Sequence, residues 1–583
     1  MATLPPEKIS RRSINWRTRI ARSERAGLFI VAGIIPMLVI FLVLITFWTS
    51  VIEGIPGAGT AYTFNHYVAV YADPFTYTAL LNTGGFAIVT TLVSLLFGVP
   101  IAWLVERTTM CFKPFLYGMM VLGLIIPSFF VAMGWILLLH PRIGFFNFWL
   151  QQLFGPSAVV SVTTVTGMGF VQGLSLAPLA FIMCAAAFRA MNPALEEAAA
   201  VHGMGTFTTL RRVTLPLVFP AIAAAAIYIF VIGVAAFDIP AIIGLSSRLY
   251  TFSTLIYVKA LVPDDIPEYG IPAAVGLLMF IGAMVMTLWY SRFLRSSERY
   301  QIVAGKAYKV EPFDLGSWGN RAAWSYCGVF LLLAIGLPLL LVGWASLMPF
   351  LQPPSVRALE FISFDQFRDL DWDQLLRGAK NTVILMLLVP TVTIFLAIPV
   401  AWVIVRSGSR LRYAYEFLVF LPHAMPAIIF GVAALIAALF ILGNTIPLYG
   451  TVWLIAIVYI IESITFISRV LNNTLMQIHQ ELEEVGYVSG LSVVAVLRRV
   501  FVPLVLPAIV GIWLWRALVT YRELTVAAVL YDPENVTLPV VVWALWTGGG
   551  MGPAAAVTIV MLAVMTPLIM IYWIFVGRRH MVG

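Results

Sequence analysis

Long apolar runs separated by short polar segments dominate this chain of 583 residues. A run of about 20 apolar residues is enough to cross a bilayer as one helix. The run at 158–187 is the weakest of them, because Gly, Ser and Thr interrupt it. The pattern predicts an all-α membrane protein with about twelve transmembrane helices, at 27–48, 77–105, 113–139, 158–187, 217–240, 271–294, 323–347, 379–405, 413–441, 449–470, 504–530 and 553–577.

The order of landmarks in the first part of the chain returns in the second part. Asn82-Thr83 and Pro100 recur as Asn381-Thr382 and Pro399, in both cases 299 residues later (381 − 82 and 399 − 100). This repeat predicts two pseudo-symmetric halves of six helices each. We expect a basic cytoplasmic tail at 1–26, a first half at 27–294, a basic linker at 295–322 and a second half at 323–583.

A polar island interrupts each half at an equivalent place. The first island, within the loop 189–216, has an acidic residue, two small residues, a Gly six positions after the acid and an Arg pair further on. The second, within the loop 471–503, has the same spacing with an offset of 287 (484 − 197 and 490 − 203). The two sets are Glu197, Ala198, Ala199, Gly203, Arg211 and Arg212, and Glu484, Val485, Gly486, Gly490, Arg498 and Arg499.

Each island predicts a short helix, a break and a second helix. Asn192 before Pro193 is a typical helix cap, and the acidic residues that follow favour a helix N-terminus. Gly203 can end this helix in the left-handed conformation, and Thr206 is expected to begin the next one. In the second island Ser492 is expected to take the capping role.

The spacing of these islands resembles the cytoplasmic E-A-A loop of permease subunits in binding-protein-dependent ABC importers. Val485 and Gly486 stand where that family usually has two Ala residues. The resemblance implies that 197–203 and 484–490 are coupling helices, each docking in a cleft of a separate ATPase subunit. It also implies that an extracytoplasmic binding protein delivers the solute. Phe237-Asp238-Ile239-Pro240 and Arg522-Glu523-Leu524 look like segments of ferric-iron-type permeases.

The distribution of charge orients the chain in a membrane, which the resemblance implies is the cytoplasmic (inner) membrane of a prokaryote. The net charge is +8, but the basic residues gather in alternate loops, as the positive-inside rule requires when both termini are cytoplasmic. The excess of positive charge therefore indicates a membrane orientation and not a nucleic-acid partner. The predicted outer segments hold only these Lys and Arg residues: Arg142, Arg248, Lys259, Arg357, Arg368, Arg377 and Lys380.

The sequence contains no phosphate-binding G-x-x-x-x-G-K-S/T loop, so ATP and Mg²⁺ are expected on the partner ATPase and no cofactor on this chain. Neither a catalytic triad nor a nucleophile elbow is present, which favours a transport subunit over an enzyme. The three cysteines are isolated, and the six histidines have no metal-site spacing, so no metal site is expected.

Ionisable residues inside or near the spans are costly and therefore suggest a translocation pathway. Asp238 and Glu523 hold comparable places in the two halves and would attract a cationic substrate or brace the outer gate, unless they bond locally. Glu462 and Arg516 would form a structural pair between the tenth and eleventh spans. His423, between Pro422 and Pro426, would line the pathway or be satisfied within the bundle.

These observations favour the fused permease of an ABC importer, with ferric iron as the preferred solute. Polyamine, thiamine or phosphonate would use the same machinery. The alternative from another class is a secondary transporter driven by an ion gradient, which also shows internal repeats and broken helices. Glu462 favours that alternative, whereas the paired islands have no role in it.

Overall fold

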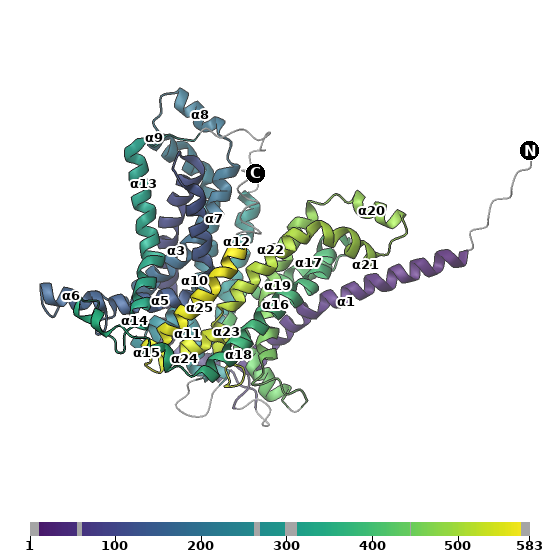
Figure 1. Ribbon diagram of the computed structural model, residues 1–583. Helices are drawn as coiled ribbons and strands as arrows, with labels where there is room; N and C mark the ends of the chain where they lie inside the picture. Colours follow the sequence, from purple (N-terminus) through teal and green to yellow (C-terminus); the bar gives the residue numbers. More distant parts are fainter. Residues whose placement is uncertain (1–10, 55–60, 262–268, 298–311, 444, 573–583) are drawn as a thin grey trace, which may run out of the picture. The chain divides into compact units, whose positions relative to one another are not determined.

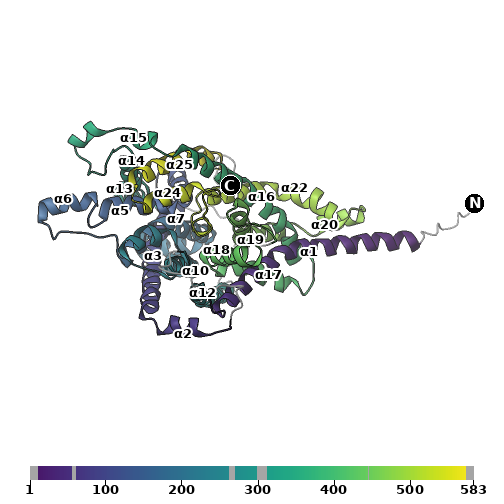
Figure 2. The same ribbon diagram turned by 90° about the horizontal axis from the view of Figure 1, so that it is seen from below.

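The computed structural model describes residues 11–54, 61–261, 269–297, 312–443 and 445–572 (Figures 1 and 2). Every regular element within these residues is a helix, which confirms the predicted all-α membrane fold. The predictions for residues 1–10 of the tail and for 298–311 of the linker lie outside the described residues.

Ten helical stretches in the described residues are long and apolar enough to cross a membrane. Most of them coincide with the predicted runs, because the apolar stretch between two polar loops sets the length of a spanning helix. They contain α1 (Arg11–Ser50), α3 (Pro74–Arg107), α7 (Val165–Ala190), α10 (Leu215–Ala235), α12 (Gly270–Ser297), α13 (Gly316–Leu331) with α14 (Leu337–Ser346), α16 (Trp372–Arg406), α19 (Val452–Met476), α22 (Val502–Tyr521) and α25 (Met551–Tyr572).

Two predicted spans are broken in the middle. The run 113–139 forms α4 (Lys113–Ile125) and α5 (Ser128–Leu139), which meet at 92° around Pro127. The run 413–441 likewise divides into α17 (Arg412–Ala424) and α18 (Ala427–Ile436), with Pro426 between them. Proline lacks an amide hydrogen and disfavours helical geometry in the residue before it. The expectation of one continuous helix at 113–139 was wrong, whereas the break in 413–441 falls where Pro422 and Pro426 interrupt the apolar run in the sequence.

The segment 241–270 lies between two predicted spans, and its acidic residues Asp264, Asp265 and Glu268 are typical of an outer loop, but it is largely helical and largely buried as far as Leu261. It contains a π-helical turn, η2 (Pro240–Gly244), and then α11 (Phe252–Leu261); the two helical arms of this segment are bent by 70°. Thr83 explains where α11 begins, because its Oγ1 accepts a hydrogen bond from the Phe252 amide at 2.9 Å. Asn82 Nδ2 donates to the carbonyl of Tyr250 at 3.1 Å. The Asn-Thr pair of α3 therefore caps a neighbouring helix that the sequence did not reveal.

The second half repeats this arrangement at α24 (Leu538–Thr547). Thr382 Oγ1 accepts from the Leu538 amide at 2.9 Å, and Asn381 Nδ2 donates to the carbonyl of Val536 at 2.9 Å. The Asn-Thr repeat thus has one structural role in both halves. The remaining short helices include α2 (Asn65–Ala72), α6 (Phe145–Phe154), α15 (Asp365–Arg368) and α23 (Thr525–Val529).

Helices α3 and α7 run side by side and pack through glycine (Figure 1). Gly169 and Gly173 are four residues apart, so they lie on one face of α7. A Cβ atom on Gly169 would lie 2.7 Å from Val89 Cβ, and one on Gly173 would lie 2.5 Å from Val93 Cβ. Ser94 Oγ also donates to the Gly173 carbonyl at 3.0 Å. Small residues permit this close approach, which is the common way for helices to associate in lipid.

The chain divides into two compact units that are not the two sequence halves. One unit contains residues 1–44, 384–423 and 456–520, and the other contains 45–383, 424–455 and 521–583. The first polar island lies in the second of these units and the second island in the first. The division into a first half, a linker and a second half remains a prediction from the sequence repeat.

Candidate coupling site

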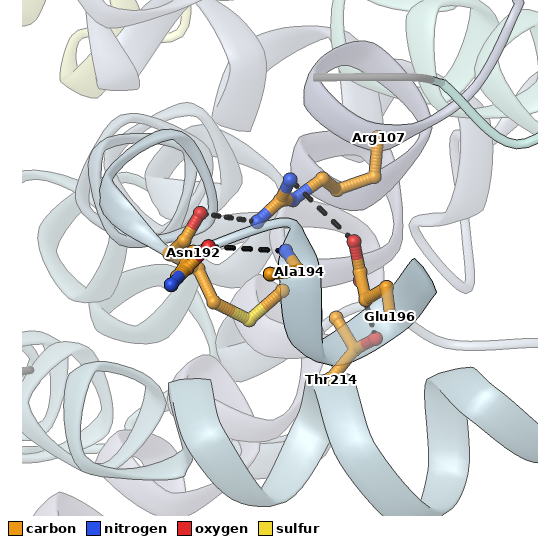
Figure 3. Close-up of polar contacts among 6 residues, drawn as sticks. Arg107, Asn192, Ala194, Glu196 and Thr214 are labelled. Carbon is orange, nitrogen blue, oxygen red and sulfur yellow. Dashed lines mark hydrogen bonds and ion pairs between the residues drawn. The ribbon is translucent and has the colours of Figure 1, made fainter. Parts of the chain in front are cut away.

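The first island folds as the short helix α8 (Ala194–Val201), a glycine turn and α9 (Thr206–Thr209). Asn192 Oδ1 accepts from the Ala194 amide at 3.0 Å, as the sequence predicts for a capping residue (Figure 3). Gly203 has a φ of +78°, which confirms the predicted left-handed turn at the end of α8. The Met204 amide closes that turn by donating to the Ala199 carbonyl at 3.1 Å.

The second island forms helices with equivalent bounds, 287 residues later, in α20 (Glu481–Val488) and α21 (Val493–Val496). Gly490 has a φ of +82°, and the Leu491 amide donates to the Gly486 carbonyl at 3.0 Å. Ser492 Oγ accepts from the Ala495 amide, which confirms its capping role. The helix therefore forms in the second island although it contains Val485 and Gly486 instead of two alanines.

Burial follows the same pattern along both short helices. Only Glu196 and Ala199 of α8 are buried, and only their equivalents Glu483 and Gly486 of α20 are buried. A Cβ on Gly486 would lie 3.0 Å from Val496 Cγ2, so a small residue is needed on this inner face. Among the residues predicted to couple to an ATPase, Ala199 and Gly486 are therefore buried and the others are exposed. Those with exposed positions are Glu197, Ala198, Gly203, Arg211 and Arg212 in the first copy, and Glu484, Val485, Gly490, Arg498 and Arg499 in the second.

A buried arginine fastens α8 to the end of a spanning helix. Arg107, the last residue of α3, lies with its Nη1 3.5 Å from Glu196 Oε2, and the two side chains are only 1% and 6% exposed. Its Nη2 donates to the carbonyl of Met191, the residue that ends α7, at 2.8 Å (Figure 3). Thr214 Oγ1 donates to the other oxygen of Glu196 at 2.6 Å. We call Arg107, Glu196 and the Met191 carbonyl the first latch.

The second copy contains an equivalent group at the end of α16. Arg406 Nε donates to Glu483 Oε1 at 2.7 Å, with both side chains at most 10% exposed. Its Nη2 donates to the carbonyls of Leu475 and Ile478 at 3.0 and 2.7 Å. We call Arg406, Glu483 and the Ile478 carbonyl the second latch. Its members follow those of the first by 299 residues for the arginine and by 287 for the other two, which are the offsets of the sequence repeat.

The two latches differ in their surroundings. The hydroxyl of Thr214 has no counterpart in the second copy, where Phe501 occupies the equivalent position. The second ion pair is shorter, and Arg107 Nε is buried without a hydrogen-bond partner in the described part of the chain. An additional surface pair, Arg189 to Glu106 at 2.6 Å, lies beside the first latch.

The sequence analysis missed the four latch side chains. Glu196 and Glu483 stand directly before the acidic residues that define the islands, and nothing in the linear pattern distinguishes the buried acid from the exposed one. A sequence signal did exist. Arg107 recurs as Arg406 at the offset of 299 residues that relates the spans, and Glu196 recurs as Glu483 at the offset of 287 residues that relates the islands. The recurrence becomes informative once the structure shows that these residues are buried, because a buried charge must be paired.

The Arg pairs of both islands lie on helix that continues into a span. Arg211 and Arg212 belong to a π-helical turn, η1 (Leu210–Thr214), between α9 and α10, and both side chains are exposed. Arg498 and Arg499 hold the same place in η8 (Leu497–Phe501) before α22. The extra residue in each turn offsets the helix register at the point where the span begins.

Asp238 and Glu523 belong to one polar cluster at the broken helices. Asp238 Oδ2 accepts from Ser128 Oγ at 2.6 Å, and its Oδ1 accepts from Thr525 Oγ1 at 3.0 Å. Glu523 Oε1 accepts from the Val526 amide at 3.2 Å and so caps α23. Arg522 Nη1 donates at 2.9 Å to the carbonyl of Ile126, beside the break between α4 and α5. These bonds favour the bracing role over substrate attraction, and the pathway-lining role remains a prediction.

The other predicted pathway residues, Glu462, Arg516 and His423, lie in the unit that contains the second latch. Arg516 Nη2 donates to the carbonyl of Tyr459 at 3.3 Å. The predicted pair between Arg516 and Glu462 stays a prediction, although both residues have interaction partners. The ring of His423 lies 5.7 Å from that of Phe420, and the Phe420 ring in turn faces the guanidinium of Arg469. These contacts suit a polar residue held within the bundle.

Comparison with known proteins identifies both repeats. Residues 94–296 and 393–580 match the family described as binding-protein-dependent transport system inner membrane component, and each match includes one island and one latch. A Haemophilus influenzae protein named for ferric transport is 23% identical over 74% of this chain, which spans 66% of that relative's length. The ferric transport system permease FbpB of Actinobacillus pleuropneumoniae is 24% identical over 86% of the chain and 71% of its own. A Salmonella typhi protein named for 2-aminoethylphosphonate transport is 26% identical over 28% of the chain and 62% of its own.

Proposed function

Because this chain belongs to the family of inner membrane components of binding-protein-dependent transport systems, we propose that it is a fused permease, whose two halves together form the import pathway of an ATP-driven ABC importer. The observation that carries the proposal is the pair of short helices α8 and α20, which have the same length, the same left-handed glycine turn and the same pattern of burial. Two equivalent exposed helices are suited to binding two equivalent ATPase subunits.

The exposed sides of α8 and α20 suit docking to protein. Leu195, Ala198 and Val201 recur every three residues and so form one stripe along α8, and Leu482, Val485 and Val488 form the equivalent stripe on α20. Val201 and Val488 are 86% and 89% exposed, although both lie outside the spans, where no lipid would cover them. Exposed apolar side chains beside Glu197 and Glu484 favour a partner cleft that is partly apolar and partly basic.

Each short helix would insert into one ATPase subunit. ATP and Mg²⁺ bind to the ATPase pair, and closure of that pair moves α8 and α20, which changes the access of the pathway between the two faces of the membrane. Such a change requires the ATPase pair to have different affinities for the two states of the permease. The permease itself performs no chemistry in this scheme, and it acts as a transport subunit in the inner membrane with both termini in the cytoplasm.

Ferric iron is the solute we favour. Relatives named for ferric transport extend over most of the chain, whereas the 2-aminoethylphosphonate relative covers little more than a quarter of it. The iron would be cargo delivered by the extracytoplasmic binding protein, which sets much of the selectivity. A phosphonate is the alternative cargo for the same machinery.

The test is ATP-dependent uptake by proteoliposomes that contain this chain, its partner ATPase and the cognate binding protein loaded with radioactive ferric iron. We expect uptake to need all three components and to stop with vanadate. Val201→Asp and Val488→Asp should weaken retention of the ATPase. Val68→Asp is the matched control, since Val68 is 63% exposed on α2, on the predicted outer side. Uptake without the ATPase would refute the proposal, whereas uptake of 2-aminoethylphosphonate but not of iron would change only the cargo.

A further inference from the structure

The two latches join three elements at one guanidinium. Arg107 belongs to the end of α3, its carbonyl acceptor ends α7, and its carboxylate partner lies on α8. Arg406 joins α16, the end of α19 and α20 in the same way. Each arginine therefore touches two spanning helices and the short helix that would contact an ATPase.

Little else holds the short helices to the spans. Of the eight residues in α8, only Glu196 and Ala199 are buried, and the glycine turn at Gly203 leaves the C-terminal end exposed. The equivalent is true of α20, where the inner face consists of Glu483 and Gly486. Ala199 and Gly486 offer a methyl group and a hydrogen atom to the contact. The charged, short-range bonds of the latch are consequently the stiffest connection between each short helix and its spans.

A buried ion pair is an unusual choice where stability alone is at stake, because apolar residues of similar size often serve as well or better. The chain nevertheless has one at the same position in both copies, although Ala198-Ala199 has become Val485-Gly486 and Thr214 has become Phe501. The feature that both copies keep is the set of partners: one arginine contacts a glutamate of the short helix and a carbonyl at the end of a spanning helix, although a different guanidinium nitrogen meets the carboxylate in each copy. This shared set of partners ties α8 and α20 to the ends of their spans.

We propose that Arg107–Glu196 and Arg406–Glu483 are positioning pairs that transmit movement of the coupling helices to the ends of α3 with α7 and of α16 with α19. The proposal rests on the function proposed above and adds residues that do not contact the ATPase. Breaking a latch leaves the docking face intact but lets the short helix move without moving its spans. The consequence is loss of coupling: ATP is hydrolysed and less solute crosses.

The experiment compares four glutamine variants of the full complex in proteoliposomes. Glu196→Gln and Glu483→Gln remove one charge from each latch while keeping shape, and we expect retained ATPase with solute imported per ATP reduced about fivefold or more. Glu197→Gln lies on the exposed face and is expected to lower ATPase retention, with solute imported per ATP kept in the complexes that remain. Glu106→Gln breaks the surface pair beside the first latch and serves as the matched control, with coupling unchanged.

A purely structural role would lower the amount of folded protein and leave the solute imported per ATP unchanged, so that outcome overturns the proposal. Glu483→Gln carries the test if Glu196→Gln fails to fold, because Arg406 keeps two carbonyl acceptors. If the wild-type complex imports solute and both latch variants import as much solute per ATP as wild type, the proposed role of the latches is refuted and the proposed function is not. A wild-type complex that neither retains the ATPase nor imports solute refutes the proposed function, and the latches with it.

Discussion

Substitution of Asp238 by Asn tests whether its carboxylate holds the broken helices together. Its carboxylate accepts from Ser128, the first residue of α5, and from Thr525, the first residue of α23. Asp238→Asn keeps the shape and one oxygen acceptor but replaces the second acceptor by an amide donor. It also removes a negative charge that lies against two helix N-termini, where the helix dipole favours it.

The size of the effect follows from those two bonds. A hydrogen bond to a charged group contributes about 1.5 to 3 kcal/mol, and a partly exposed carboxylate such as Asp238 belongs in the lower part of that range. We therefore expect Asp238→Asn to lower the free energy of unfolding by about 1 to 2 kcal/mol. Asp238→Ala leaves both hydroxyl groups without this acceptor and should cost about 2 to 4 kcal/mol.

Equilibrium unfolding in mixed micelles, with helicity followed as the proportion of dodecyl sulfate increases, measures these differences. Asp532→Asn is the matched control, because Asp532 is also partly exposed and its Oδ1 accepts from the Glu534 amide only two residues away. That local bond crosses no helix boundary, so its loss should cost less than about 1 kcal/mol. Uptake of iron measured on the same variants separates stability from transport.

The bracing interpretation fails if Asp238→Asn and Asp532→Asn unfold alike. If Asp238→Asn keeps wild-type stability while uptake falls by about tenfold or more, the bracing interpretation is wrong and Asp238 lines the pathway. Loss of stability with uptake per folded complex preserved confirms the brace.

Four further substitutions test the fold. Thr83→Val and Thr382→Val should each lower the free energy of unfolding by about 1 to 2 kcal/mol, and exchange of the capped amides of α11 and α24 should accelerate, because each loses its side-chain acceptor. Gly173→Ala places a Cβ 2.5 Å from Val93 Cβ and should cost about 1 to 3 kcal/mol in the same titration, whereas an unchanged midpoint would show that α3 and α7 can separate freely. Gly203→Val forces a β-branched residue into a φ of +78° and should destabilise α8 by at least about 1 to 2 kcal/mol, seen as faster amide exchange across the helix; exchange like that of wild type would contradict the role of the glycine turn.

Local features of the polar islands were predictable from the sequence because each depends on residues close in the chain. Asn192 reaches an amide two positions away, and Ser492 reaches one three positions away. The left-handed glycines at 203 and 490 follow from the absence of a Cβ atom at the end of a helix. The two equivalent copies were visible for the same reason, since the spacing within each island is a property of the linear sequence.

The breaks and the buried helices were harder to predict. Pro127 lies within an apolar run that is long enough to span, and hydropathy alone does not show that the chain turns there by 92°. Segment 241–270 contains the acidic residues Asp264, Asp265 and Glu268, and this polar composition obscured α11, which lies before them. The role of Asn82-Thr83 as a cap depends on Phe252, which lies 169 residues further along the chain. A local sequence pattern cannot reveal a contact between residues so far apart in sequence.

The sequence by itself determined the spanning helices, the repeat and the two polar islands, because hydrophobic length and short-range capping depend on residues that are close together in the chain. The tertiary structure alone decided which of two adjacent glutamates turns inward to Arg107 and which stays in water. An α-helix directs neighbouring residues about 100° apart, so Glu196 and Glu197 cannot both face the end of α3. That choice depends on where a buried guanidinium lies in space, and only the packing of α3, α7 and α8 places it there.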